Sequence, residues 1–153
     1  MSYTLQAVVA KSGSFPENLP EKLQVLNLRC GIDMIPITTE ARHLFGISSL
    51  PLTDGVVENI PPELAKLCET LSNNCMAAYI EAEFFGGAGM QAHVLLSEGK
   101  IISPVVASQA AINEALCFLG ITKGKYHDEF EAIGLGRHSF TDDWNSNDLP
   151  SDN

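Results

Sequence analysis

The chain has 153 residues, of which 45% are hydrophobic and 18% charged, as expected for one globular domain that buries its own core. Nineteen acidic residues against nine basic ones give a formal net charge of -10. This charge repels nucleic-acid phosphates and anionic membrane surfaces, but it attracts a basic protein. Direct nucleic-acid binding and membrane attachment are therefore disfavoured, and a basic protein partner is favoured.

The N-terminal sequence carries no recognisable targeting signal. Its start, MSYTLQAVVAKSG, lacks a basic segment followed by a continuous apolar run, and no apolar stretch approaches the roughly 20 residues that span a bilayer. The four cysteines, Cys30, Cys68, Cys75 and Cys117, show no CxxC spacing and lie in apolar stretches, which is typical of reduced core thiols. We expect a cytoplasmic protein without disulfides.

The first third of the chain predicts an opening strand and several short elements. Residues 3–10 are rich in strand formers and end before a stretch with glycine and proline. Residues 21–38 fit a short helix or strand, followed by an edge strand around Pro36. Residues 39–45 predict one or two helical turns that Thr39 caps and Gly46 ends, and residues 47–60 predict a loop.

The clearest helix follows Pro61 and Pro62. Apolar side chains repeat there at helical spacing, at Leu64, Leu67, Cys68 and Leu71. A β-hairpin follows, because apolar and polar residues alternate on both sides of the glycine-rich segment 86–89. Aligning the apolar positions of the two strands pairs Phe85 with Gln91, sets Glu83 opposite His93, and leaves a loop from Gly86 to Met90.

The rest of the chain predicts a third strand, a helix and a tail. Residues 100–107 form the strand, with an edge or bulge at Pro104. Ser108 caps an amphipathic helix that ends at Gly120, and residues 127–134 form a short helix. The predicted fold is α+β, an antiparallel sheet with a central meander at about 76–107 packed against two main amphipathic helices. One domain spans 1–138, and the acidic residues 139–153 form a mobile tail unless Trp144 docks.

Candidate chemistry is sparse. Glu83 opposite His93 has the composition of a base and its orienting partner, but a structural cross-strand pair is commoner and no nucleophile is evident. Possible metal ligands gather near the C-terminus, yet their spacing matches no metal-binding pattern; they are His127, Asp128, Glu129, His138, Asp142 and Asp143. The glycine-rich segment lies between strands and lacks the lysine of a phosphate-binding loop. We expect no cofactor, no metal and no enzymatic activity.

Three segments carry a family resemblance: GGAGMQAHVLLSEGKIISP, AINEALCFLG and DEFEAIGLGRH. They resemble small bacterial immunity proteins of polymorphic toxin and contact-dependent growth inhibition systems, over roughly residues 31–138. The resemblance implies a protein that binds a toxin domain, often a nuclease, and occludes its active site. The positions that match it look like fold determinants; they are Gly86, Gly87, Gly89, Gln91, Asn113, Gly134 and Gly136.

The leading functional hypothesis is neutralisation of a cognate basic toxin domain. The expected contact residues are the C-terminal acidic group with Trp144 as an aromatic anchor, namely Asp128, Glu129, Glu131, Asp142, Asp143 and Trp144. An ordinary solvated acidic surface is the competing interpretation of this group. Two other functions remain open from the residues alone. One is a regulatory or interaction module without a toxin, and the other is a small enzyme that uses the Glu83 and His93 pair.

Overall fold

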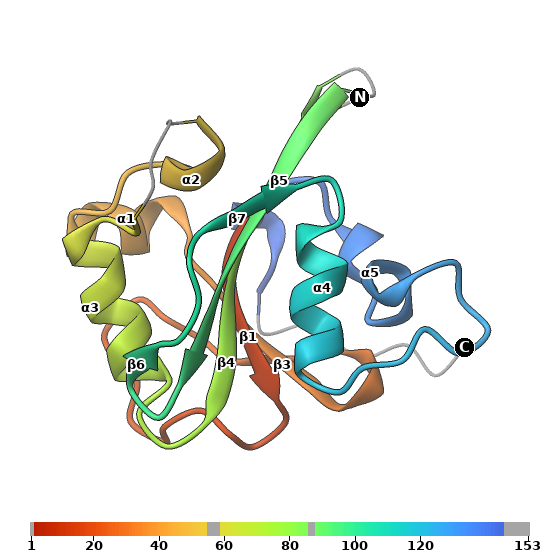
Figure 1. Cartoon of the computed structure of the whole chain (residues 1–153). Helices are drawn as coiled ribbons and strands as arrows, with labels where there is room; N and C mark the ends of the chain where they lie inside the picture. The colour runs from red at the N-terminus through yellow and green to blue at the C-terminus, as the bar shows by residue number, and fades with distance from the viewer. Residues whose placement is uncertain (1, 55–58, 86–87, 146–153) are drawn as a thin grey trace.

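The computed structural model describes residues 2–54, 59–85 and 88–145 (Figure 1). The strands are β1 (Ser2–Lys11), β2 (Leu26–Asn27), β3 (Ile32–Pro36), β4 (Met76–Phe85), β5 (Ala88–Ser97), β6 (Lys100–Ile101) and β7 (Val106–Ser108). The α-helices are α1 (Thr39–Phe45), α2 (Pro51–Asp54), α3 (Pro62–Leu71), α4 (Ala111–Phe118) and α5 (Glu129–Ala132). Short 3₁₀ helices are η1 (Arg29–Gly31), η2 (Leu135–Arg137) and η3 (Thr141–Asp143).

Within the described residues the strands form one seven-stranded antiparallel sheet. Its order is β2-β3-β1-β4-β5-β6, and β7 also pairs with β5. The long strands β1, β4 and β5 lie side by side at its centre. The chain interrupts the third strand of the meander near Pro104, so β6 and β7 are two short pieces on the same edge of β5. The predicted α+β fold and its central meander are confirmed.

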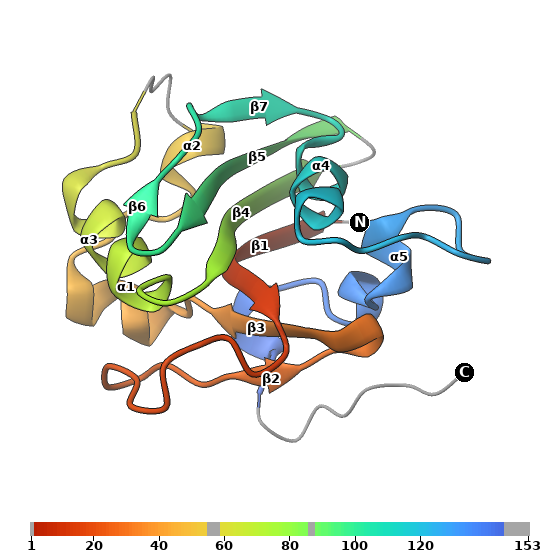
Figure 2. The same cartoon turned by 60° about the horizontal axis from the view of Figure 1, so that its bottom comes forward.

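Helices cover both faces of the sheet (Figures 1 and 2). On the side of α1 and α3, the core includes Val8 and Tyr79. On the side of α4, the core includes Val9, Ile80 and Ile112. Consecutive residues of β1 and β4 are therefore buried on opposite faces, which gives these strands continuous apolar runs in place of a simple alternation.

The helix α3 forms as its sequence predicts. Pro62 lies in its first turn, where the missing N–H of proline removes no helical hydrogen bond. Leu64, Leu67 and Cys68 point into the core and are 0%, 5% and 0% exposed. Each fully buried leucine contributes about 1.5–3 kcal/mol of stability. A Leu64→Ala change would therefore loosen the packing of α3 on the sheet.

The helix α4 packs on the sheet as predicted, but it begins later. Its N-cap residue is Ala110, and the Ser108 hydroxyl accepts the Ala110 N–H at 3.2 Å in the preceding turn. The Gln91 side chain, on β5, accepts the Ile112 N–H at 2.9 Å. Because the sheet supplies this acceptor, the first turn of α4 does not depend on a local serine cap.

The predicted hairpin register is wrong. The ladder pairs Phe85 with Ala88 and Glu83 with Met90, so only residues 86 and 87 lie between the last paired residues. Residues 88–90, expected in the loop, belong to β5, whereas Gly86 and Gly87 lie outside the described residues. Since both faces of the sheet are buried, apolar alternation did not select one register.

Smaller differences occur in the first half of the chain. β3 is covered on its outer side by β2, so it is not an edge strand. The predicted loop 47–60 contains the short helix α2, and its residues 55–58 fall outside the described ones. The cap of α1 is Thr38, whose hydroxyl accepts the Ala41 N–H at 3.3 Å, while Gly46 ends the helix with a φ of 70°.

The four cysteines are free thiols, but they are not all core residues. Cys68 is buried and Cys75 is half-buried. Cys30 and Cys117 are exposed, contrary to the expectation from their apolar neighbours. Apolar neighbours in sequence therefore did not place these two side chains inside.

The chain stays on the domain beyond residue 138. Ser139 accepts the Thr4 N–H through its carbonyl at 2.8 Å, and the Thr141 hydroxyl accepts the Gln6 N–H at 3.1 Å. These bonds cover the part of β1 that extends past β3. Trp144 then packs into the core with 3% of its surface exposed. Residues 139–145 thus dock on the domain, and the remainder of the expected tail lies outside the described residues.

Candidate functional site

An acidic groove lies on the sheet face that carries α1 and α2. Its cavity volume is about 410 Å³. Its lining residues are Thr4, Gln6, Ile37, Thr39, Arg42, Ser49, Leu50, Glu83, Phe140, Thr141, Asp142 and Asp143. We use the name acidic groove for this set of residues.

Two rows of cross-strand neighbours on β1 and β4 underlie the acidic groove. The outer row pairs Thr4 with Glu83, and the inner row pairs Gln6 with Glu81. Paired residues of an antiparallel ladder point to the same face. The inner row is buried, with Gln6 2% and Glu81 0% exposed, whereas Thr4 and Glu83 are half-buried.

One wall is held in place by the buried Glu81. Its carboxylate accepts the Leu52 N–H at 3.0 Å, the Thr53 N–H at 2.8 Å and the Tyr79 hydroxyl. Burial raises the pKa of Glu81, and the hydrogen bonds from Tyr79, Thr53 and Leu52 partly oppose that shift. This carboxylate joins the start of α2 to the sheet, so its role is to position the wall.

Gln6 holds the segment just before α2. Its side-chain amide donates to the Ser48 carbonyl at 3.2 Å, and its side-chain oxygen accepts the Leu50 N–H at 3.3 Å. Leu50 has a φ of 45°, in the left-handed region that non-glycine residues rarely adopt. The two bonds from Gln6 offset the cost of that backbone conformation.

The opposite wall is the segment Phe140 to Asp143. Thr141 fixes it to β1 through the bond to Gln6, and the Asp142 carboxylate accepts the Thr39 N–H at the start of α1 at 2.8 Å. Asp143 is exposed, and Phe140 is 49% exposed. Asp142 is also exposed, so the wall presents two carboxylates and one aromatic ring to the solvent.

The groove carries an excess of negative charge. Three carboxylates line it, from Glu83, Asp142 and Asp143, against the single guanidinium of Arg42. Arg42 donates to the Thr39 hydroxyl at 3.3 Å. A concave surface lined by one sign of charge concentrates its field and attracts cationic groups.

The predicted acidic contact residues fall into two groups. Asp142 and Asp143 line the acidic groove. Glu83, which the sequence predicts to face His93, lines the same groove. Asp128 caps α5 by accepting the Glu131 N–H at 2.9 Å. Glu131 lines a separate cavity, and Glu129 lies in the first turn of the same short helix. Glu131 and the pair Asp142 and Asp143 therefore line different cavities.

Trp144 is not a surface anchor. Its indole is 3% exposed and contacts the His138 ring edge-on, with 4.8 Å between ring centroids. A buried ring offers little area to a partner. The exposed aromatic ring of this segment is Phe140, which the sequence analysis did not single out.

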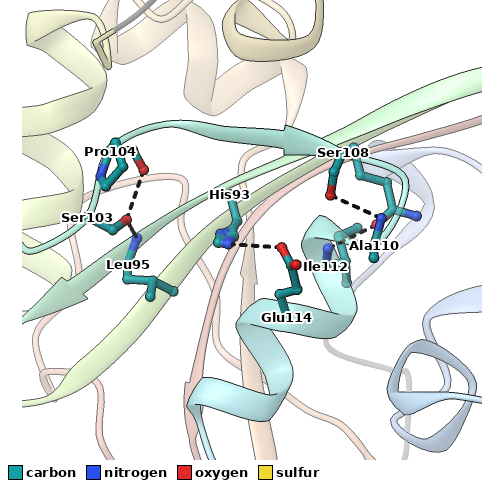
Figure 3. Close-up of polar contacts among 9 residues, drawn as sticks. His93, Leu95, Ser103, Pro104, Ser108, Ala110, Ile112 and Glu114 are labelled. Carbon is teal, nitrogen blue, oxygen red and sulfur yellow. Dashed lines mark hydrogen bonds and ion pairs between the residues drawn. The ribbon is translucent and has the colours of Figure 1, made fainter.

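The predicted pairing of Glu83 with His93 is also wrong. His93 pairs with Ile80 and points to the α4 face, whereas Glu83 points into the acidic groove on the other face. His93 is 4% exposed and faces Glu114 of α4, with 3.8 Å between Nε2 and Oε1 (Figure 3). Neither ring nitrogen has a hydrogen-bond partner among the described residues. Burial lowers the pKa of His93, and the Glu114 carboxylate opposes this shift.

Several residues of the family-like segments have structural roles. A Cβ added at Gly89 would collide with the backbone of Glu83 and Phe84. Gly134 has a φ of +84°, and a Cβ there would lie 3.0 Å from Nη2 of Arg29. Asn113 accepts the Phe130 N–H at 2.8 Å and so joins α4 to α5. These contacts account for Gly89, Gly134 and Asn113 without a ligand.

The described residues contain no group of three or more histidine, cysteine, aspartate or glutamate side chains placed to hold a metal ion. None of the helices in that part of the chain is long and apolar enough to cross a bilayer.

Comparison of the chain with protein-family models, with curated proteins and with solved structures found no match.

Proposed function

We propose that this protein binds a cognate basic toxin domain and neutralises it by occluding its active site, as an immunity protein does. The observation that carries the proposal is the acidic groove, where Glu83, Asp142 and Asp143 meet beside the exposed ring of Phe140. The resemblance of three segments to immunity proteins also supports it.

The electrostatic argument concerns the surface that a nuclease presents. An enzyme that holds nucleic acid needs lysine and arginine side chains where the phosphates bind. The formal charge of -10 steers such a surface toward this protein, and the carboxylates of the groove pair with it on contact. Neutralisation of this kind needs no catalytic group on the inhibitor, and it takes place in the cytoplasm where the toxin acts.

The test is co-expression with a basic toxin domain, for which the products of the adjacent genes are the first candidates to screen. We expect the wild-type protein to restore growth of cells that produce the toxin, and the purified proteins to form a complex whose affinity falls with added salt. The double variant Glu83→Gln, Asp143→Asn should protect less. The matched control is a double variant on exposed residues of α3, Glu63→Gln and Glu69→Gln. It has the same net charge as the groove variant, and it should protect as the wild type does.

Growth arrest in the presence of wild-type protein, with no complex at low salt, would refute the proposal. A complex with a protein that is not toxic would favour a regulatory interaction module instead.

A further inference from the structure

Large apolar side chains are exposed at the free end of the β4–β5 hairpin. Phe85 is 58% and Met90 is 40% exposed. Figure 1 shows this hairpin projecting beyond the helices on both sides of the sheet. Exposed apolar residues scattered singly are ordinary, but neighbouring ones that adjoin a charged groove mark a candidate interface.

The ladder places these residues beside the acidic groove. Thr4 pairs with Glu83, and Glu83 pairs with Met90, so the three form one row across β1, β4 and β5 on the same face. Phe85 lies two residues from Glu83 on β4 and therefore points to the same face. Glu83 is thus both a lining residue of the groove and the direct neighbour of the apolar hairpin end.

The local structure explains why the described residues leave this part of the face partly exposed. Glu81 and Gln6 hold residues 48–53 over the inner row of the sheet. The next row outward contains Glu83 and Met90, which are half-buried and exposed. The pairing of β5 with β7 also stops at Gln91, so Met90, the preceding residue of β5, has no partner on β7.

We propose that the groove and the hairpin end form one docking surface for an amphipathic cationic segment of the partner, with lysine or arginine side chains in the groove and large apolar side chains against Phe85 and Met90. This inference rests on the proposed function, because it specifies the segment of the basic partner that is bound. Charge complementarity selects the cationic groups. Apolar contact excludes water around them, which strengthens the charge pairing.

Two synthetic peptides of equal positive charge separate the two contributions. In the first, lysine and arginine alternate with leucine and phenylalanine; in the second, serine replaces every leucine and phenylalanine. We expect the first peptide to bind about ten-fold more tightly than the second, because a buried apolar anchor contributes about that much to affinity. In NMR titrations its binding should shift the backbone amides of Glu83, Phe85, Met90 and Asp143.

A variant series locates the apolar contact. Phe85→Ser and Met90→Ser should each weaken the first peptide several-fold and leave the second unchanged. Ile102→Ser is the matched control, since Ile102 is 51% exposed and bonds to Leu95 of β5, roughly 16 Å along the strand from Met90. Dispersed NMR spectra of all variants would show that they fold.

Equal affinity of the two peptides, or amide shifts confined to other surfaces, would overturn the inference. The outcomes separate it from the proposed function. If the toxin is neutralised but Phe85→Ser and Met90→Ser bind and protect as the wild type does, the docking surface is wrong and the proposed function stands. If the first peptide binds at these residues but no toxin is neutralised, the docking surface stands and the proposed function is wrong.

Discussion

Replacing Glu81 by alanine tests the buried contact that positions the groove wall. The change removes the acceptor for the Leu52 and Thr53 N–H groups and for the Tyr79 hydroxyl. Each buried donor left without an acceptor costs about 1–3 kcal/mol. Burial disfavours the charged carboxylate and so raises the pKa of Glu81. Removing that carboxylate also removes this unfavourable burial, which offsets part of the cost. We expect Glu81→Ala to lower the free energy of unfolding by roughly 2–4 kcal/mol at pH 7.

Urea unfolding followed by circular dichroism measures this change by linear extrapolation. The control is Glu69→Ala, an exposed carboxylate on α3, which should stay within about 0.5 kcal/mol of wild type. A loss below about 1 kcal/mol for Glu81→Ala would mean that the three donors find other acceptors. The carboxylate would then not be what holds α2 on the sheet.

Three further predictions concern other parts of the fold. Because burial lowers the pKa of His93 in the folded protein, its contribution to the free energy of unfolding is complete above the ordinary value of 6.5 and is lost as the pH falls below it. Urea titrations at pH 7 and pH 5 should therefore show a smaller loss of stability at pH 5 for His93→Gln than for the wild type. Equal losses in the two proteins would contradict this. Gly134→Ala should destabilise by about 1–3 kcal/mol through its positive φ and the nearby Arg29, measured as a lower urea midpoint; an unchanged midpoint would show that the turn adapts. Trp144→Ala should cost about 3–5 kcal/mol, and thermal unfolding close to that of wild type would show that the indole is not part of the core.

The helices α3 and α4 and the first strand could be predicted because local signals agree there. In α3, apolar residues at helical spacing follow a proline that suits the first turn. In α4, Gly120 ends the helix with a φ of +90° as the sequence indicates. The start of α4 was displaced because its first turn is fixed by Gln91, a residue of β5 that is distant in sequence.

The hairpin register could not be derived from alternation. Ala77 and Tyr79 are as buried as Ala78 and Ile80, all at 0% exposure, because helices cover both faces of β4. The apolar pattern therefore fits more than one register. The consecutive glycines 86 and 87 were the better signal, since two-residue hairpin connections favour glycine pairs.

The candidate site was only partly visible in the sequence. The acidic C-terminal residues drew attention to Asp142 and Asp143, but nothing local indicated that they lie beside Glu83. Trp144 was read as an anchor, although a lone large apolar residue in an acidic segment also signals docking on the domain. Glu81, a charged residue inside the buried part of β4, was the signal for a buried polar contact that the sequence alone did not reveal.

The most direct test of the central claim is calorimetric titration of the purified basic toxin domain into this protein at low and high salt. The account predicts tight one-to-one binding that weakens with salt, and roughly ten-fold weaker binding for Glu83→Gln, Asp143→Asn than for the control Glu63→Gln, Glu69→Gln. Equal affinities of the two double variants would contradict the assignment of the acidic groove, and no binding by the wild-type protein would contradict the proposed function itself.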